Sequence, residues 1–255
     1  MNENWDRLLS RAEQLIDRIE LALPRSLTAP DWSQSVAYRY RKRGAGYGAL
    51  EPVRHIGAMQ LRDLQEIEPQ KEKIRLNTLQ FVTGRPANNV LLTGARGTGK
   101  SSLIRACLDE YAAQGLRLIE VDKADLIDLP DIVDMVSERP EKFIVFCDDL
   151  SFEDGESGYK ALKSILDGSV AATTPNVLVY ATSNRRHLLP EYMKENLSYT
   201  HSDDGEVHPG EVVEEKVSLS ERFGLWVSFY PFSQSEYLSI VAQWLASFGV
   251  GQAAI

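Results

Sequence analysis

Apolar and polar positions alternate along residues 89–229 in a pattern that predicts strands separated by helices. Short, nearly continuous apolar runs occur at 89–93, 117–121, 143–147, 176–182 and 225–229. Stretches with the three- and four-residue spacing of helices lie between them, at 100–113, 128–138, 157–167 and 186–197. Strands that are apolar on both faces and alternate with helices are typical of a buried parallel sheet. We therefore expect an α/β fold with a parallel sheet sandwiched by helices.

The N-terminal residues have a different pattern. Over residues 4–23, apolar side chains recur at helical steps, which predicts an amphipathic helix that Pro24 ends. We expect its apolar stripe to pack on the core, the alternative being a partner. Residues 25–60 are rich in Pro and Gly and are expected to be irregular. Their basic and aromatic run YRYRKR, at 38–43, could grip single-stranded nucleic acid, but a solvated linker or pairing with acidic surface is the favoured interpretation.

A phosphate-binding motif follows the first apolar run directly. The pattern G-x-x-x-x-G-K-S/T is complete from Gly94 to Ser101, between a predicted strand and a predicted helix. Its glycines allow positive φ, so that backbone N–H groups can surround a phosphate chain. Lys100 would reach the β- and γ-phosphates, and the Ser101 hydroxyl would bind Mg²⁺. The residues assigned to phosphate binding are Gly94, Ala95, Arg96, Gly97, Thr98, Gly99, Lys100, Ser101 and Ser102.

Polar residues end the next two apolar runs. Asp148 and Asp149 follow the run at 143–147, and the run at 176–182 leads to Asn184. Beside a phosphate loop, the first carboxylate can hold the Mg²⁺ shell and the second can orient or deprotonate water. The Asn184 amide can bridge the γ-phosphate and that water. Alone, such residues often only end a strand or form a turn, but their order after the loop favours a site.

Arg222 lies just before the last apolar run. An arginine at a subunit edge can reach a neighbour's γ-phosphate and stabilise the charge of the transition state. The ordinary alternative is a surface arginine that pairs within its own chain, for example with Glu221. Arg185 and Arg186 are competitors for the same catalytic role.

These elements, in this order, resemble those of the AAA+ ATPases. The stretches PANNVLLTGARGTGKSSL, KFIVFCDDLSFE, TSNRRHLLPE and residues 206–238 look like a bacterial family of uncharacterised predicted AAA+-type P-loop ATPases. The resemblance covers about Leu61 to Trp244. It implies an AAA+-like P-loop NTPase fold, ATP with Mg²⁺ as ligands, and assembly into a ring or partial ring. It implies no particular substrate.

The resemblance also implies roles for single residues. Ser101 and Asp148 would hold Mg²⁺, Asp149 would act on the water, Asn184 would be the first sensor, and Arg222 would act on a neighbouring subunit. Two residues of the segment at 63–70 would flank the adenine, namely Ile67 and Gln70.

Two departures from the AAA+ pattern weaken the expectation of a strong motor. AAA+ proteins usually carry a helical lid with a second sensor arginine after the core. Here Ser233 caps one predicted helix at 234–248, and residues 233–255 contain no Arg or Lys. The C-terminal helical lid is therefore expected to be incomplete, by nature or by truncation. Asp149 also stands where many motor ATPases have Glu, and its shorter side chain is expected to slow hydrolysis.

Composition adds few constraints. With 255 residues, 43% of them hydrophobic and 25% charged, the chain can bury a full α/β core. The net charge of −9 argues against a dedicated nucleic-acid clamp. The two cysteines fit reduced, buried thiols, and no apolar stretch is long enough to span a membrane. Without a recognisable signal peptide, we expect a cytoplasmic protein.

The sequence therefore predicts three parts: residues 1–60, a helical segment and basic linker; residues 61–232, an ATP-binding core; and residues 233–255, a lid remnant of one helix. The expected function is ATP binding with Mg²⁺ and hydrolysis that drives or gates remodelling of an unknown protein partner, in a homo-oligomer. The alternatives are a nucleotide-gated binding module with little hydrolysis and a helicase-loader-like ATPase associated with nucleic acid. A small-molecule kinase is disfavoured because the region after the core has no arginine-rich lid.

Overall fold

The computed structural model describes residues 9–16, 18, 29–42, 48–57, 59–152, 157–167, 174–184, 200–201, 207–208 and 219–250. The helix expected at 186–197 lies outside these residues. Of the loop expected at 198–216, the described part is a short antiparallel pair, β7 (Thr200–His201) with β8 (Val207–His208).

A seven-stranded sheet forms the centre of the molecule, in the order β2-β1-β4-β5-β6-β3-β9. Its pairings are parallel except that of β1 with β2. The five expected strands are confirmed to within one residue at each end. The strands are β1 (Ala37–Arg41), β2 (Ala49–Pro52), β3 (Val90–Gly94), β4 (Leu116–Glu120), β5 (Lys142–Cys147), β6 (Val177–Ser183) and β9 (Leu225–Phe229).

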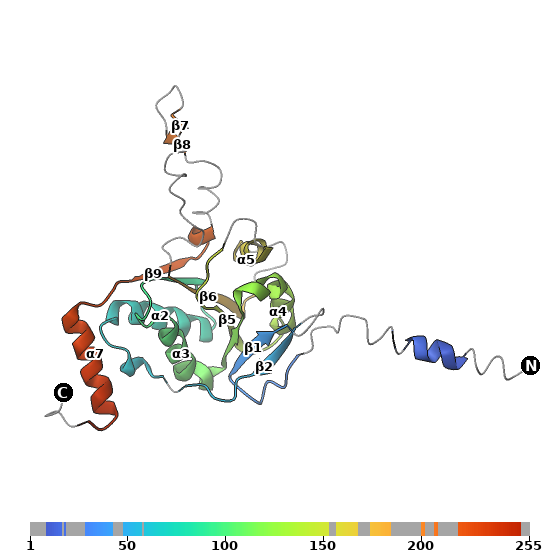
Figure 1. Cartoon of the computed structure of the whole chain (residues 1–255), viewed down its shortest axis with the longest axis horizontal. Coiled ribbons are helices and arrows are strands. Elements are labelled where there is room, and N and C mark those ends of the chain that lie inside the picture. Colours follow the sequence, from blue (N-terminus) through green and yellow to red (C-terminus); the bar gives the residue numbers. More distant parts are fainter. Residues whose placement is uncertain are drawn as a thin grey trace, which may run out of the picture.

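Helices cover both faces of the sheet, as the apolar strands require (Figure 1). Along β3, Val90 and Leu92 face one hydrophobic cluster while Leu91 faces the other, and all three are fully buried. Helices α2 (Glu68–Val82) and α3 (Lys100–Tyr111) close the first cluster. Helices α4 (Leu129–Val136) and α5 (Ser157–Leu166) close the second. The α/β sandwich predicted from the sequence is confirmed.

Helix α2 was not among the expected helices. Its buried face combines Ile74 and Phe81 with two polar residues, Asn77 and Thr78. Asn77 Nδ2 and Thr78 Oγ1 lie 2.9 and 3.0 Å from the buried Tyr180 hydroxyl of β6. A face that satisfies its polar groups inside the core does not have the apolar periodicity that marks an amphipathic helix.

The segment at 25–60 is not irregular throughout, because β1 and β2 extend the sheet at its edge. Within YRYRKR, Tyr38 and Tyr40 are fully buried and face the core. These two rings are therefore not available to stack on nucleic-acid bases, and that interpretation is wrong for them. The alternation of the run is that of a strand with one face toward the core and one toward solvent.

Two of the basic residues of this run, Arg39 and Lys42, pair with acidic residues, which is part of the favoured interpretation. Arg39 Nη2 lies 2.9 Å from Glu120 of the adjacent strand β4. Lys42 Nζ lies 2.9 Å from the carboxylate of Asp128, which also accepts a 2.8 Å hydrogen bond from the Tyr40 hydroxyl. Burial raises the pKa of Tyr40 to about 12, so this hydroxyl stays protonated and keeps donating. These pairs attach β1 and the residue after it to β4 and to the segment that precedes α4.

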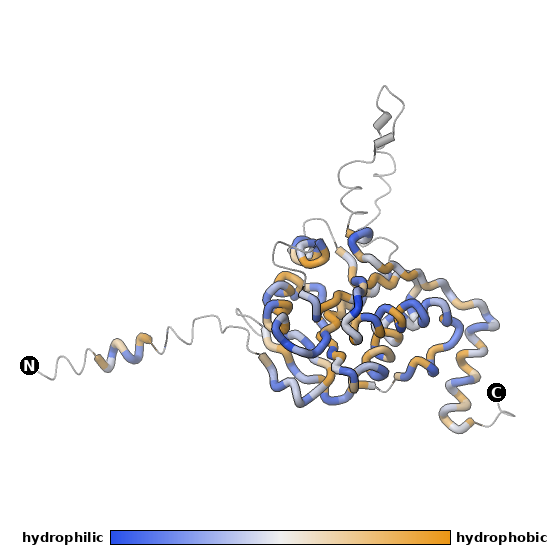
Figure 2. The backbone as a smooth tube through the Cα atoms, turned by 180° about the vertical axis from the view of Figure 1, so that it is seen from behind, coloured by the Kyte–Doolittle hydropathy of each residue, from blue (hydrophilic) through white to orange (hydrophobic). Residues whose placement is uncertain are grey.

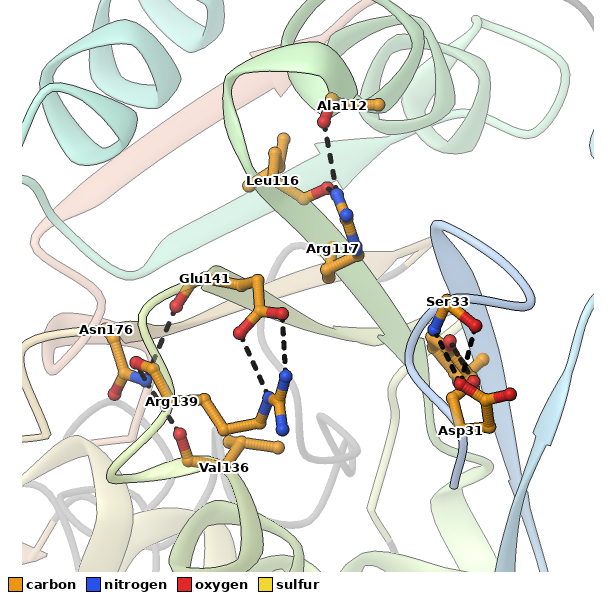
Figure 3. A network of polar contacts seen from close by, with 10 residues as sticks. Asp31, Ser33, Ala112, Leu116, Arg117, Val136, Arg139, Glu141 and Asn176 are labelled. Carbon is orange, nitrogen blue, oxygen red and sulfur yellow. Dashed lines mark hydrogen bonds and ion pairs between the residues drawn. The ribbon is translucent and has the colours of Figure 1, made fainter. Parts of the chain in front are cut away.

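A polar network joins the segment before β5 to the start of β6, at the sheet edge formed by the amino ends of the parallel strands (Figure 3). Asn176 Nδ2 donates to the carbonyls of Val136, at 2.7 Å, and Arg139, at 2.9 Å. The Arg139 guanidinium pairs with Glu141 and lies 5.3 Å from the centre of the Trp32 ring. This network connects the amino ends of β5 and β6, which lie at the opposite end of the strands from the phosphate motif.

The sequence predicted a helix near each end of the chain. Residues 9–16 are helical, but Leu9, Leu15 and Ile16 are more than half exposed, and Figures 1 and 2 place this helix away from the sheet. The expectation that its apolar stripe packs on the core is therefore wrong. Helix α7 (Gln234–Ser247) is confirmed, and Ser233 and Glu236 form the reciprocal capping bonds at its start.

The buried Tyr40 hydroxyl gives a stability test. We expect Tyr40→Phe to lower the free energy of unfolding by about 1–3 kcal/mol, because Asp128 loses a donor and the Gly48 N–H loses its 2.8 Å acceptor. Urea unfolding followed by circular dichroism measures the change. Tyr237→Phe, at a position 59% exposed, is the matched control and should change stability little. Equal stability of the two variants would contradict the buried network.

Candidate nucleotide-binding site

The phosphate motif forms the connection between β3 and α3, at the carboxyl ends of the parallel strands. Gly94, Gly97 and Gly99 have positive φ values of 131°, 75° and 89°. A Cβ on Gly94 would lie 1.9 Å from the carbonyl oxygen of Phe229, so the loop leaves the sheet too close to β9 for any side chain there. Gly99 is the N-cap of α3, which directs the free N–H groups of the first helical turn toward the loop.

A cavity of about 310 Å³ opens over this loop. It brings together the phosphate loop, the acidic pair after β5 and the end of β6. Gly94 and Ala95 do not line the cavity, but their backbone carbonyls accept hydrogen bonds from Lys100. Thr182 also lines the cavity and was not assigned a role from the sequence. The lining residues are Arg96, Gly97, Thr98, Gly99, Lys100, Ser101, Ser102, Asp148, Asp149, Thr182 and Asn184.

Lys100 is held at the base of the cavity and is only 6% exposed. Its Nζ donates to the carbonyls of Gly94, at 2.8 Å, and Ala95, at 2.6 Å, and to Asn184 Oδ1 at 3.1 Å. Burial lowers the pKa of Lys100, and the charges of Asp148 and Asp149 oppose that shift. The ammonium therefore connects the loop to Asn184 on the neighbouring strand end.

Asp148 lies between two hydroxyl groups. Its Oδ1 accepts from Ser101 Oγ at 2.6 Å and from Thr182 Oγ1 at 2.5 Å. A carboxylate beside a hydroxyl, both lining a cavity for phosphates, is a donor set that suits Mg²⁺, which binds protein through one or two oxygen ligands and keeps water and phosphate as the others. These residues fit the metal that the sequence predicts. The signal that could have identified Thr182 is its position at the end of the strand next to that of Asp148.

Asp149 has an unusual backbone conformation and an exposed carboxylate that contacts two side chains. Its φ of 50° is rare for a residue other than glycine, and such conformations cluster at functional sites. Its N–H donates to Thr182 Oγ1 at 2.9 Å. Asn184 Nδ2 donates to its Oδ1 at 2.5 Å, and Arg96 Nη2 lies 3.5 Å from its Oδ2. The Asp149 carboxylate is thus in contact with one neutral and one cationic group.

Besides Gly94 and Ala95, three assigned residues do not line the cavity over the phosphate loop, namely Ile67, Gln70 and Arg222. Ile67, 3% exposed, is the N-cap of α2 and lies next to the loop, with its Cδ1 3.6 Å from where a Cβ on Gly99 would stand. Gln70 is turned toward β9, where its Nε2 donates to the Ser228 carbonyl at 3.2 Å. Of the two predicted adenine neighbours, only Ile67 approaches the phosphate loop.

Arg222 does not line the phosphate cavity either. Its guanidinium pairs with the carboxylate of Asp167, which directly follows α5, and its side chain is 25% exposed. This is the intrachain pairing that the sequence left as the alternative, with Asp167 rather than Glu221 as the partner. The competing residues Arg185 and Arg186 lie outside the described part of the chain.

The mostly parallel sheet covered by helices on both faces, with the phosphate loop after β3, the acidic pair after β5 and the amide after β6, is an AAA+-type P-loop fold. Two single-substitution variants of RuvB from Thermotoga maritima match with a TM-score of 0.51 and 15% identity, over 75% and 76% of this chain. AMPPCP-bound DnaA from Aquifex aeolicus matches with a TM-score of 0.48 and 16% identity, over 76% of this chain. This chain matches only 55% of the RuvB chains and 56% of the DnaA chain. At 15% sequence identity, the similarity to RuvB shows a shared fold and no more.

The family itself is shown by a sequence match. The model described as "Protein of unknown function (DUF815)" matches residues 33–254, and the chain belongs to this family. A search of the curated proteins found no significant match. Among the described residues, none of the helices combines the length and apolarity that a membrane crossing requires.

The close approach of Gly94 to β9 gives a second test. We expect Gly94→Ala to cost at least about 2 kcal/mol of unfolding free energy, because the added Cβ collides with the Phe229 carbonyl and separates β3 from β9. Gly84→Ala is the matched control: Gly84 has a φ of 73° but open space around it, so only the backbone cost of about 1 kcal/mol applies. Thermal unfolding of both variants compares the costs. A Gly94 variant no less stable than the control would exclude the tight contact.

Proposed function

We propose that this protein binds ATP with Mg²⁺ and hydrolyses it to ADP and phosphate. The observation that carries the proposal is the convergence of Lys100, Ser101, Asp148, Asp149 and Asn184 on one cavity over the phosphate loop. Two of them begin α3, two directly follow β5 and one directly follows β6, and each is of the type that phosphoryl transfer uses.

Binding would rest on the loop and its flanks. The backbone N–H groups of residues 94–102 and the N-terminus of α3 would surround the phosphates. Lys100 would exchange its carbonyl acceptors for β- and γ-phosphate oxygens, and Ile67 would contact the base or ribose side of the nucleotide. Ser101 and Asp148 would hold Mg²⁺, which supplies positive charge against the phosphate oxygens when bound. Gln70 would contribute only if its bond to Ser228 is broken.

Hydrolysis would use Asp149 and Asn184. The water oxygen forms a bond to the γ-phosphorus while the bond to the oxygen that bridges to the β-phosphorus breaks, and that oxygen leaves with the electron pair on ADP. Asp149 accepts the proton that the water loses, and the Asn184 amide orients the water. For this, Asp149 must first be released from Arg96 and Asn184.

A nucleotide-gated binding module with little turnover is the second candidate. The observation in its favour is the engaged state of the Asp149 carboxylate, which accepts from Asn184 at 2.5 Å. If ATP does not release that contact, the site binds nucleotide and works as a switch. A nucleic-acid-associated ATPase has less support, because the two tyrosines that suggested stacking are buried in the sheet.

For the cellular role, we propose that ATP drives or gates the remodelling of a protein partner by a homo-oligomer of this chain. AAA+ proteins of this fold assemble and bind ATP, which supports the proposal at the level of the fold.

Two substitutions separate binding from turnover. We expect Lys100→Ala to abolish ATP binding, because no other cation sits at the base of the cavity among the described residues. We expect Asp149→Asn to bind ATP with near wild-type affinity and to lower kcat by about 100-fold or more, because the proton acceptor is lost. Calorimetric titration and phosphate release measure the two quantities.

Lys160→Ala, an exposed lysine on α5, is the matched control and should behave as the wild type. Tight ATP binding by the Lys100 variant would refute the assignment of the site. Wild-type turnover no faster than that of the Asp149 variant would favour the switch.

The role of Arg222 across a subunit boundary can be tested by complementation. We expect Arg222→Ala to keep ATP binding and lose most turnover, with activity per protomer of the wild type rising with protein concentration. Mixing Arg222→Ala with Lys100→Ala should then restore part of the turnover, because mixed interfaces combine an intact loop with an intact Arg222. Light scattering with and without ATP measures the assembly.

Asp167→Ala is the control, since it removes the intrachain partner but leaves Arg222. If the mixture shows no recovery and both substitutions only lower stability, Arg222 serves the fold and not a neighbour's site.

A further inference from the structure

Arg96 is the second cation of the phosphate cavity, and its position differs from that of Lys100. Among the described residues that line the cavity, only these two carry a positive charge. Lys100 is 6% exposed and already bonded to three oxygens, whereas the Arg96 side chain is 81% exposed. The two therefore do not duplicate each other: the Lys100 ammonium is fixed against the loop carbonyls, and the Arg96 guanidinium lines the same cavity from a solvent-exposed position.

The contact of Arg96 with Asp149 is weak enough to be exchanged. The two groups are 3.5 Å apart, and the Asp149 side chain is itself 57% exposed. Ion pairs of this kind contribute little to stability because water screens them and both side chains lose freedom. A stronger anion that enters the cavity can therefore take the guanidinium from Asp149 without a large cost to the fold.

The terminal phosphate of ATP is such an anion. It offers several oxygens, more than one negative charge, and the spacing that a guanidinium matches with two parallel N–H donors. Arg96 lies on the loop itself, between Gly94 and Gly97, so it moves with the backbone that would surround the phosphates. ADP lacks the group that this arginine would bind.

We propose that Arg96 binds the γ-phosphate of ATP held by its own protomer, and that this exchange of partners frees the Asp149 carboxylate from its cationic contact. The proposal rests on the proposed function of the same site. It makes the arginine in the loop both a sensor of the third phosphate and a source of positive charge during its transfer. An arginine supplied within the same chain is known to stabilise this type of transition state.

This contribution is separable from that of Arg222. Arg96 acts within one protomer, so its effect should not depend on protein concentration. Arg222, paired with Asp167 and outside the cavity, would act only after assembly.

The test compares ATP and ADP binding, with Mg²⁺, for the wild type and for Arg96→Ala, Arg96→Lys and Arg105→Ala. Arg105 is an exposed arginine on α3 that does not line the cavity, which makes it the matched control. We expect Arg96→Ala to weaken ATP binding by about tenfold and leave ADP binding unchanged, because one charge-assisted contact to the γ-phosphate is lost. Arg96→Lys should recover part of the loss, and the control should match the wild type.

Single-turnover hydrolysis at low protein concentration measures the consequence for the reaction. We expect Arg96→Ala to slow it by about 100-fold, the effect of removing one donor to the developing charge. The proposal is overturned if Arg96→Ala weakens ADP and ATP equally, if it weakens neither, or if it speeds hydrolysis, which would make Arg96 only a restraint on Asp149. If the wild type binds ATP but does not turn it over, the comparison of ATP with ADP still decides. Failure of the proposed function would be seen in a different variant: Lys100→Ala would still bind ATP tightly.

Discussion

The parallel pairing of β3 with β6 on one side and β9 on the other sets the position of every group in the site. Thr93 pairs with Ser183, and Gly94 pairs with Phe229. Because parallel strands in register end at the same edge, the loop after β3 meets Asn184 after β6 and the acidic pair after β5. The approach of Gly94 to β9 is the tightest point of this arrangement, and a side chain there would displace the loop from the strand ends.

The groups gathered at this edge hydrogen-bond to one another. Lys100 bonds to its own loop and to Asn184, Asn184 bonds to Asp149, and Ser101 and Thr182 bond to Asp148. Lys100 is the buried member of this set, and its three acceptors satisfy an ammonium group that would be costly to leave unpaired. Under the proposed function, nucleotide binding would exchange these partners, and the exposed pair of Arg96 with Asp149 would exchange at the least cost.

The differences from the sequence-based expectations have a common cause. The run at 38–43 was expected to be a basic linker, yet it contains a strand whose tyrosines are buried, because long-range pairing with β4 gives it a core face. The face of α2 is partly polar because Asn77 and Thr78 bond to Tyr180 across the core. The helix at 9–16 shows the converse: its apolar stripe predicts burial, but its described leucines are exposed. In each of these three segments, the pattern of apolar and polar residues shows which side chains are buried only when the surface packed against the segment is known.

The sequence by itself determined the parallel α/β core, the positions of five of its seven strands to within a residue, and the residue types of the site. Buried strands and a phosphate loop impose a local composition that can be recognised in the chain. The tertiary structure decided which of those residues meet. It brought Thr182 to Asp148, turned Gln70 away toward β9, paired Arg222 with Asp167, and set Arg96 beside Asp149. These contacts join residues far apart in the chain. They depend on the register of the strands and on side-chain rotamers, and both are set by packing between distant segments. The local sequence does not determine that packing.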